Sequence, residues 1–227
     1  MKKILIVVAH PDDEILGMGG TIAKYASEGA EIALLIVTDG STSQYESNPN
    51  LKMILENKKI ETKRAADIVG ITHIFYGGLP DMKLDMIEHI VINATIEKVI
   101  NEFNPDIVYT HFEGDVNKDH QCVYQSTLVA CRPTPGQKIT ELYSFSVPSS
   151  TEWSPQNSKT VFIPNVYIDI EGEFSQRKYS AMSEYETEIR EYPHPRSIET
   201  LRILDQAVGL QVGLKCAESF IAHRVVK

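Results

Sequence analysis

An imidazole and a group of carboxylates follow one another in the run His10-Pro11-Asp12-Asp13-Glu14. Imidazole and carboxylate together are typical ligands of Zn²⁺ and similar divalent ions. Such groups are costly to bury unless a metal ion, water or another partner satisfies them. An alternative is that Asp12 and Asp13 only cap a following helix and stabilise its positive end. Capping explains one carboxylate but not His10, so the run predicts a metal-binding or catalytic site.

A second cluster of ionisable residues lies further along the chain and runs from His111 to His120. Catalytic zinc sites commonly take three protein ligands and leave one position for water. His10, Asp13 and one of His111 or His120 would complete such a set. A lone histidine at the end of a strand is more often a hydrogen-bonded structural residue, but two clusters in matching positions argue against that interpretation.

The chemistry that this set suits is the hydrolysis of an amide. A zinc ion lowers the pKa of bound water and polarises a carbonyl group, and a carboxylate that is not a ligand can take the proton from that water. Neighbouring side chains diverge in direction, so Asp12 cannot easily bind the same ion as His10 and Asp13. We therefore expect Asp13 to be a ligand and Asp12 to be a general base that later passes its proton to the leaving amine.

Both clusters follow apolar runs that predict buried strands, at residues 4–9 and 107–109, and both precede helical patterns. In open α/β sheets, ligands bind at the edge formed by the carboxyl ends of the strands. The clusters are therefore expected to meet at one edge of a parallel sheet.

The wider pattern alternates strands and helices. Strands are predicted at residues 3–8, 32–37, 73–76 and 107–109, and helices at 15–28, 55–69 and 87–102. Strands separated by helices indicate βαβ units with right-handed crossovers. The sequence therefore predicts an α/β protein whose residues 1–132 form a Rossmann-like, doubly wound core with a mostly parallel sheet.

From residue 133 the pattern changes. Short β-like runs at 142–147, 161–163 and 166–170 are followed by helices near 174–188 and 198–212. We expect residues 133–227 to form a mixed β and helical C-terminal part that completes the site within a single domain of 227 residues.

Composition excludes several classes of protein. A net charge of −9 argues against nonspecific nucleic-acid binding, and no run reaches about 18 consecutive apolar residues, so no membrane span is predicted. The apolar run near the N-terminus is too short for a secretion signal and is interrupted at His10. Three cysteines without paired spacing indicate reduced thiols and a cytoplasmic location. A homo-oligomer is compatible with the sequence.

Further polar residues are candidate substrate contacts. Asp39 and Ser41 follow the second predicted strand, and the polar stretch 41–49 is a candidate lid. Arg132 could bind a hydroxyl, carboxylate or phosphate group, or it could be an exposed cation at a helix end. Asp81 is a weaker candidate at the end of another strand.

The segment Tyr192-Pro193-His194-Pro195-Arg196-Ser197 is unusual for a linker. Its two prolines restrict the backbone around His194, and Ser197 can cap the next helix. This rigid loop could close the site with His194 and Arg196, or it could only mark the start of a helix.

The chain resembles the PIG-L/LmbE-like metal-dependent de-N-acetylases, which include the deacetylases of mycothiol and bacillithiol synthesis. The resemblance rests on residues 9–14 (Ala-His-Pro-Asp-Asp-Glu), 19–21 (Gly-Gly-Thr) and 115–120 (Asp-Val-Asn-Lys-Asp-His). It implies that His10, Asp13 and His120 bind zinc and that Asp12 is the general base. It also implies a substrate with an N-acetylglucosamine-type group on a sugar, glycoside, nucleotide sugar or thiol conjugate. Fe²⁺, Mn²⁺ and Co²⁺ also suit such ligands.

The second motif of that family usually reads His-Pro-Asp-His, whereas here Asn117 and Lys118 replace the first two residues. The resemblance assigns the missing histidine to stabilising the oxyanion. Asn117 could supply a donor through its amide, or His194 or His111 could do so from elsewhere in the fold.

Two other functions are compatible with parts of the sequence. A dinucleotide-dependent oxidoreductase would use the Rossmann-like core, with Asp39 after its glycines. However, residues 17–20 (Gly-Met-Gly-Gly) are not a GxGxxG motif, and the run beginning at His10 occupies the turn where a pyrophosphate would lie. A non-catalytic metal- or sugar-binding module would need the ligands but not Asp12 as a base. Metal content distinguishes a hydrolase from the oxidoreductase. Turnover of an N-acetylated sugar distinguishes a hydrolase from the binding module.

Overall fold

A computed structural model describes residues 1–40 and 47–227. The described part of the chain contains a seven-stranded sheet in the order β3-β2-β1-β4-β5-β7-β6. Five strands pair in parallel, and they are β1 (Lys3–Val8), β2 (Glu31–Thr38), β3 (His73–Leu79), β4 (Ile107–His111) and β5 (Glu141–Phe145). The predicted Rossmann-like, mostly parallel sheet is confirmed.

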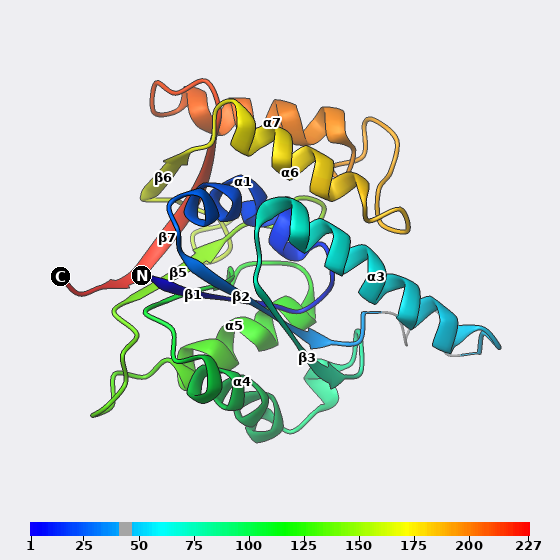
Figure 1. Ribbon diagram of the computed structural model, residues 1–227, viewed down its shortest axis with the longest axis vertical. Coiled ribbons are helices and arrows are strands. Elements are labelled where there is room, and N and C mark those ends of the chain that lie inside the picture. Colours follow the sequence, from blue (N-terminus) through cyan, green and yellow to red (C-terminus); the bar gives the residue numbers. More distant parts are fainter. Residues whose placement is uncertain (41–46) are drawn as a thin grey trace.

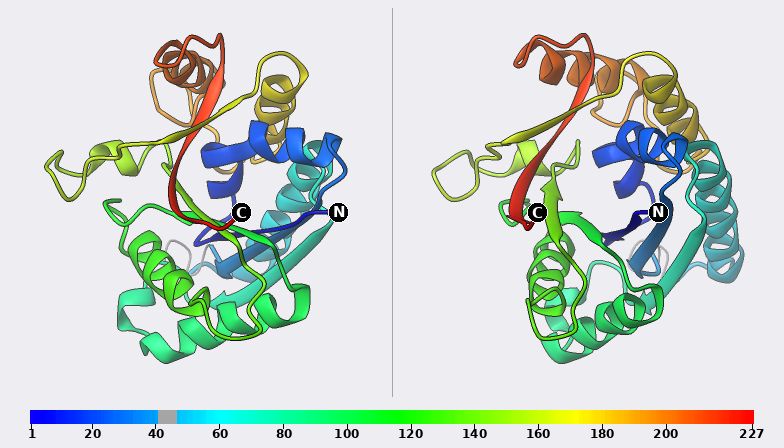
Figure 2. Two further views of the ribbon diagram at one scale, coloured as in Figure 1. Left: turned by 90° about the vertical axis from the view of Figure 1, so that its left-hand side faces the viewer. Right: turned by 60° about the vertical axis from the view of Figure 1, so that its left-hand side comes forward.

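Helices cover both faces of this sheet (Figures 1 and 2). One face carries α1 (Asp13–Ser27), α3 (Leu51–Val69), α6 (Glu173–Ser183) and α7 (Ile198–Leu210). The other face carries α4 (His89–Phe103) and α5 (Lys118–Ala130). Two short 3₁₀ helices, η1 (Leu84–Met86) and η2 (Thr151–Trp153), lie in connections between these elements.

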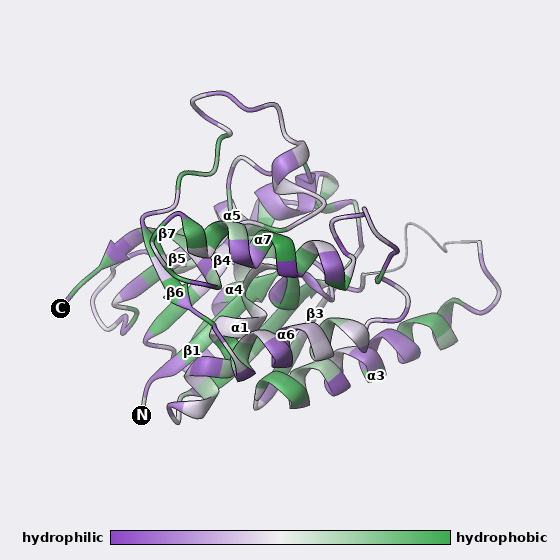
Figure 3. Ribbon diagram, turned by 90° about the horizontal axis from the view of Figure 1, so that it is seen from above, coloured by the Kyte–Doolittle hydropathy of each residue, from purple (hydrophilic) through white to green (hydrophobic). Residues whose placement is uncertain are grey.

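The apolar run of β1 is continuous because both of its faces are covered. Ile4 and Ile6 pack into the core beneath α1, α3 and α6, whereas Leu5 and Val7 pack into the core beneath α4 and α5. A parallel strand buried on both faces has this composition. Figure 3 shows the same distribution, with largely apolar central strands and helices of mixed character.

The strand order reverses at β1, which pairs with β2 on one side and β4 on the other. In doubly wound sheets, such a reversal separates the loops that leave the carboxyl ends of the two strands and creates a crevice for ligands. His10 follows β1 and His111 ends β4. The fold therefore brings the two predicted clusters together at this crevice.

Glycines allow α1 to pack closely against the sheet. A Cβ atom at Gly17 would overlap the ring of Phe145, and a Cβ atom at Gly20 would lie 2.8 Å from Cδ1 of Ile170. The glycines that follow the first motif thus fix the position of the helix that begins at Asp13.

The C-terminal part extends the same sheet. β6 (Val166–Asp169) pairs antiparallel with β7 (Ala217–Val225), and β7 in turn pairs antiparallel with β5. The strand β7 is not predicted by the sequence pattern. The β-like run 161–163 is not a strand in the structure. Its Phe162 packs edge-on against Phe112, with ring centroids 5.2 Å apart.

Cys122, Cys131 and Cys216 are all free thiols. Within the described residues, no helix has both the length and the apolar character needed to cross a membrane.

Candidate active site

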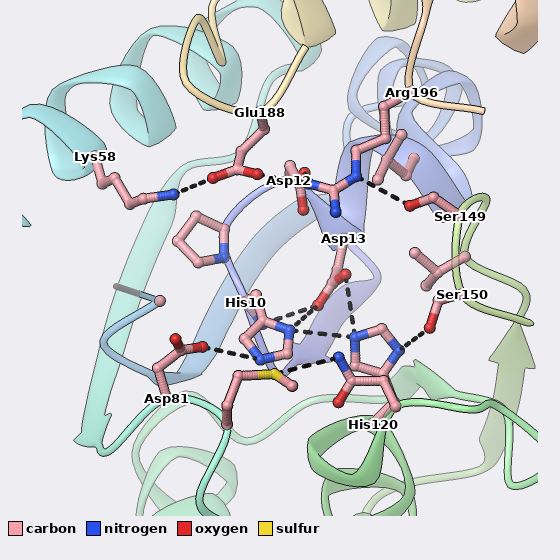
Figure 4. A pocket seen from close by; sticks show the side chains of 16 residues that line it. His10, Asp12, Asp13, Lys58, Asp81, His120, Ser149, Ser150, Glu188 and Arg196 are labelled. Atoms are coloured by element: carbon pink, nitrogen blue, oxygen red, sulfur yellow. Dashed lines mark hydrogen bonds and ion pairs between the residues drawn. The ribbon is translucent and has the colours of Figure 1, made fainter. Parts of the chain in front are cut away.

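A cavity of about 120 Å³ lies at the carboxyl ends of β1 and β4 (Figure 4). Its walls come from the start of α1, the start of α5 and loops of the C-terminal part. We call it the polar pocket. The residues that line it are His10, Pro11, Asp12, Asp13, Leu16, Gly40, Lys58, Asp81, Met82, Asn117, His120, Val147, Ser149, Ser150, Glu188 and Arg196.

Three side chains converge in this pocket in the manner of metal ligands. Nδ1 of His10 lies 3.2 Å from Nε2 of His120 and 3.4 Å from Oδ2 of Asp13. Nε2 of His120 lies 3.4 Å from Oδ1 of Asp13. Tetrahedral coordination with bonds of about 2.0–2.1 Å separates ligand atoms by roughly 3.3–3.4 Å. The donor set and its spacing therefore fit a divalent ion such as Zn²⁺.

The second nitrogen of each imidazole faces a carboxylate. Nδ1 of His120 lies 3.1 Å from Oδ2 of Asp115, and Nε2 of His10 lies 3.2 Å from Oδ2 of Asp119 and 3.3 Å from Oδ1 of Asp81. Such partners fix the tautomer and orientation of a metal-binding histidine. They leave Nε2 of His120 and Nδ1 of His10 to face one another at 3.2 Å.

Two of these carboxylates are themselves firmly held. Asp115 accepts hydrogen bonds from the Ser150 hydroxyl, from the Thr151 hydroxyl at 2.8 Å and from the backbone N–H of Asn117 at 2.8 Å. These bonds and the adjacent His120 lower the pKa of Asp115 against the effect of burial.

Asp119 accepts from the backbone N–H groups of Met82 at 2.6 Å and Leu84 at 3.0 Å. Asp119 also belongs to a second group of three potential ligands, with His10 and Asp81. Because its oxygens already hold the loop after β3, we interpret Asp119 as a support for His10.

The cluster attracts positive charge. Burial lowers the pKa of His10, but the Asp119 and Asp13 carboxylates raise it to about 10. Burial also opposes protonation of His120, yet Asp13 and Asp115 raise its pKa to about 9. Burial would raise the pKa of Asp13, but the neighbouring imidazoles hold it well below its usual range. An excess of carboxylates around facing imidazoles is the electrostatic setting that a bound cation satisfies.

His111 takes a different position from His120. Its Nε2 accepts the backbone N–H of Ala9 at 2.8 Å, and its ring stacks on that of His120 with centroids 3.9 Å apart. Burial, together with the His120 charge, lowers the pKa of His111 to about 3. His111 is therefore neutral with its Nε2 lone pair occupied. Of the two histidines that the residue pattern left open, the geometry favours His120 as a ligand.

Asp12 lines the pocket without joining either group of potential ligands. Its backbone has φ of 98°, in the left-handed region that aspartate and asparagine tolerate better than most residues. Burial raises the pKa of Asp12 well above its usual range, Arg196 opposes this shift, and Asp13 adds to it. A carboxylate with a raised pKa beside a potential metal site suits proton transfer near neutral pH.

Arg196 connects Asp12 to the C-terminal part (Figure 4). Its Nη1 lies 3.4 Å from Oδ2 of Asp12 and also donates to Glu188, while its Nε donates to Oγ of Ser149 at 2.9 Å. Lys58 from α3 donates to the other oxygen of Glu188. The predicted position of Arg196 at the site is therefore observed, and its side chain contacts Asp12.

Asn117 and Asp81 also line the pocket, as the sequence suggested. Oδ1 of Asn117 caps α5 by accepting the backbone N–H of Asp119 at 2.9 Å. Nδ2 of Asn117 lies 3.7 Å from Sδ of Met82, which is a weak partner. The amide N–H groups of Asn117 are thus available to a ligand.

The structure does not bring the other predicted residues into the pocket. Nδ1 of His194 accepts the backbone N–H of Arg196 at 3.1 Å, and its ring packs against Trp153. Arg132 lies exposed just beyond the far end of α5, and because α5 begins at the pocket, its length of about 20 Å carries Arg132 away from the site. Asp39 lines a neighbouring cavity. Ser41 and most of the candidate lid lie outside the described residues.

Sequence reasoning missed several residues that line or support the pocket. Ser149 and Ser150 precede η2, Lys58 lies within α3, and Glu188 lies in the turns after α6. None carries a local signal, because each reaches the pocket only through tertiary packing. Asp115 could have been found, since it lies within the second motif.

Two comparisons of the sequence with known proteins agree with one another. The family model described as PIG-L, GlcNAc-PI de-N-acetylase, matches residues 5–131, which is more than half of the chain. The chain is 27% identical over 190 residues to an uncharacterized deacetylase, YaiS, of Escherichia coli K12, which covers 82% of this chain and 91% of that protein.

Two solved structures share the fold. N,N'-diacetylchitobiose deacetylase of Pyrococcus horikoshii superposes with a TM-score of 0.78 at 19% identity, covering 98% of this chain and 84% of that one. GalB, the 4-carboxy-2-hydroxymuconate hydratase of Pseudomonas putida KT2440, superposes with a TM-score of 0.77 at 20% identity, covering 100% and 99%. This fold therefore supports more than one reaction.

Proposed function

Because the chain belongs to the PIG-L family of GlcNAc-PI de-N-acetylases, we propose that it is a zinc-dependent hydrolase that removes the acetyl group from an N-acetylglucosamine-type sugar or conjugate. The observation that carries this proposal is the polar pocket itself. Ligand atoms of His10, Asp13 and His120 lie 3.2–3.4 Å apart, and Asp12, whose pKa is raised, lies beside them without joining them.

In the proposed site, His10, Asp13 and His120 hold one divalent ion. Such an ion supplies polarisation of the amide carbonyl and a lower pKa for water when it is bound. Asp115 and Asp119 orient the two imidazoles through the nitrogens that face away from the ion.

Asp12 acts first as the general base and then as the general acid. It takes a proton from water as the water oxygen bonds to the carbonyl carbon, and it returns that proton to the amine nitrogen as the C–N bond breaks. The products are acetate and a free amine. Asn117 donates an N–H to the developing negative charge on the carbonyl oxygen, because its amide faces the pocket with only a weak partner.

The structure supports a role at the site for some of the remaining predicted residues and not for others. Arg196 lies in the pocket, where it can contact substrate or act on Asp12. His194 is turned toward the backbone of Arg196, so Asn117 is the better candidate for the oxyanion donor. Neither Asp39 nor Arg132 lines the polar pocket in the described part of the chain, so we assign them no substrate contact.

The rival functions receive less support. A dinucleotide would place its pyrophosphate at the start of α1, where the buried Asp13 and Glu14 carboxylates oppose negative charge. A non-catalytic binding module would not require Asp12 to have a raised pKa beside the ligands. The cytoplasmic location and the homo-oligomer stay predictions.

The decisive experiment measures acetate released from a panel of N-acetylated sugars. The panel contains N-acetylglucosamine, N,N'-diacetylchitobiose and N-acetylglucosaminyl conjugates. The protein is assayed after removal of metal and after reconstitution with Zn²⁺, Fe²⁺, Mn²⁺ or Co²⁺. We expect release only from reconstituted protein. Metal-loaded, folded protein that released no acetate from any member would contradict the proposed function.

Metal analysis of His120→Ala tests the ligand assignment separately. We expect one ion per chain in the wild type and a large loss of metal in the variant, because one of three ligands is removed. His111→Asn is the matched control, since His111 stacks on His120 but lies outside the proposed ligand set. Full occupancy in folded His120→Ala protein would remove His120 from the set.

A further inference from the structure

A second cavity of about 370 Å³ lies directly beside the polar pocket. It is bordered by α7, β7 and the loop that follows β5, and we call it the side cavity. Most of its lining surface is apolar, with Pro148, Phe162, Leu204 and Val208 among its walls. The side cavity is about three times larger than the polar pocket, yet the proposed function assigns it no role.

Leu16 and Val147 line both cavities. Both are only 2% exposed, so each is almost fully covered by the rest of the protein where the two cavities adjoin. Leu16 follows Asp13 by one turn of α1 and therefore lies on the same side of the helix as the proposed metal ligand.

The position of Val147 is fixed by hydrogen bonds. Its backbone N–H donates to the Thr151 hydroxyl at 2.9 Å, and its carbonyl accepts from the backbone N–H groups of Ser150 and Thr151. Thr151 also donates to Asp115, which supports His120. Val147 is therefore held rigidly relative to the proposed metal site.

Leu16 and Val147 are also buried apolar side chains that line the polar pocket. Most other walls of the polar pocket are polar or charged. The apolar exceptions are Pro11, which borders a cavity on the Lys58 side, and Met82, which is 52% exposed. The methyl group of a bound acetamide is most stable against buried apolar atoms.

We propose that Leu16 and Val147 form a partition that holds the acetyl methyl group and closes the side cavity to the substrate, so that the enzyme selects acetyl over longer N-acyl groups. This inference rests on the proposed deacetylase function and adds the residues that determine its acyl specificity. Beyond the partition, the apolar walls of the side cavity would suit the carbon chain of a longer acyl group. Lys178, Asp205 and Glu218 also line this cavity, and the Lys178 ammonium group lies 2.8 Å from a carboxylate oxygen of each of the other two.

The test uses glucosamine acylated on nitrogen with acetyl, propionyl, butyryl or hexanoyl groups, and the same series on chitobiose. Release of free amine is measured with wild-type, Val147→Ala and Leu16→Ala proteins. A methylene group that does not fit an apolar pocket typically costs about 10–200-fold in kcat/KM. We therefore expect the wild type to prefer acetyl over butyryl by at least about tenfold, and Val147→Ala to reduce this ratio about tenfold by opening the side cavity.

Val208→Ala is the matched control, because Val208 lines the side cavity but not the polar pocket. It removes the same two methyl groups and should leave the ratio of acetyl to butyryl turnover unchanged. Circular dichroism and thermal unfolding verify that each variant is folded. Val147→Ala is the milder change. Leu16→Ala removes more buried volume and opens the partition at a second, independent position.

The outcomes separate the two proposals. If the wild type releases no amine from any substrate, the proposed function fails and the partition with it. If the wild type cleaves acetyl and hexanoyl groups equally well, only the partition is wrong. The partition is also overturned if folded Val147→Ala and Leu16→Ala both keep the wild-type ratio, or if Val208→Ala changes it as much as they do.

Discussion

Two clusters of buried ionisable side chains lie along the same helix, α1, and they differ in how their charges are satisfied. The cluster in the polar pocket surrounds Asp13 at the start of α1. The other cluster is a triad in which Nζ of Lys178 lies 2.8 Å from carboxylate oxygens of both Asp205 and Glu218. Glu218 also accepts the backbone N–H groups of Gly20 at 3.1 Å and Thr21 at 2.7 Å.

The triad has a structural explanation. The backbone of Met18 is not helical, so α1 is kinked there and the N–H groups that follow lose their helical partners. Glu218 supplies the missing acceptors, and Lys178 neutralises Glu218 and Asp205. Nearly all of its polar atoms find partners within the protein. The exception among the described residues is Oδ2 of Asp205, and burial raises the pKa of this carboxyl to about 6.

The polar-pocket cluster contains no such protein cation paired between carboxylates. Facing nitrogens of its two imidazoles lie 3.2 Å apart beside the cavity, and the surrounding carboxylates favour added positive charge. Burial of charge therefore does not by itself identify a functional site. The distinction lies in the groups that meet. In the triad a protein cation is paired with two carboxylates, whereas in the polar pocket two imidazole nitrogens and a carboxylate face one another at the spacing of metal ligands. Substitutions in the two clusters should then have opposite consequences.

The largest expected effect is the loss of turnover in the Asp12→Asn variant. Removing the general base should lower the deacetylation rate by about 10²–10⁴. Asparagine keeps the size of the side chain and tolerates the left-handed backbone of residue 12, so folding should be preserved. The measurements are acetate release, metal content and thermal unfolding. Loss of metal, or a near-normal rate, would show that Asp12 and Asp13 do not divide the roles of base and ligand.

The reverse pattern is expected for Lys178→Met. Removing one partner of a buried ionic group typically costs about 3–5 kcal/mol of unfolding free energy, and here it leaves Asp205 and Glu218 without their cation. Urea unfolding at pH 8 should show this loss, whereas metal content should remain at one ion per chain. The cost should be smaller at pH 5, because Asp205 can then be neutral. Unchanged stability with lost metal would invert the proposed assignment of the two clusters.

The same contrast explains how much the sequence could predict. The first motif was readable because His10, Asp12 and Asp13 are adjacent and follow a continuously apolar strand. The alternation of strands and helices up to residue 132 also predicted the parallel sheet correctly, because a strand buried on both faces has an unmistakable composition. Both signals are local in the sequence.

The parts that the sequence did not predict depend on contacts between distant residues. Lys178, Asp205 and Glu218 lie on three separate elements, and only the folded chain brings them together. β7 was missed because its half-exposed end carries polar residues such as His223 and Arg224. Arg132 and His194 were expected at the site because of their residue types. The direction of α5 and the turn before α7 place their side chains elsewhere.

An intermediate effect is expected at Asn117, which has two separable roles. Asn117→Asp keeps an oxygen to cap α5 but removes the N–H donors that face the pocket. We expect kcat to fall by roughly 10²–10³ if the donor stabilises the oxyanion, with little change in unfolding free energy. Asn117→Ser is the control for the added negative charge, since serine also caps helices. A normal kcat in both variants at full metal occupancy would exclude Asn117 as the donor.

The smallest expected effect concerns the contact of Arg196 with the general base, Asp12. It appears as a change in the pH dependence of kcat/KM. Asp12 must be ionised to accept a proton, so activity should rise with pH as Asp12 loses its own proton. Burial raises the pKa of Asp12 and Arg196 lowers it. Removing the cation in Arg196→Met should therefore raise this pKa further and move the acid limb of the kcat/KM profile to higher pH. Moving the limb up by about one pH unit lowers kcat/KM about tenfold at pH values below the limb and leaves it unchanged well above the limb.

Arg196→Lys is the matched control, because lysine keeps a positive charge but cannot reproduce the contacts of the guanidinium with Asp12, Ser149 and Glu188. Its acid limb should lie between those of the wild type and Arg196→Met. A uniform loss of kcat/KM at every pH, with the limb unmoved, would instead show that Arg196 binds the substrate. In that case Arg196 would contact the substrate in the pocket. The pKa of Asp12 would then be set by burial and by the neighbouring carboxylates.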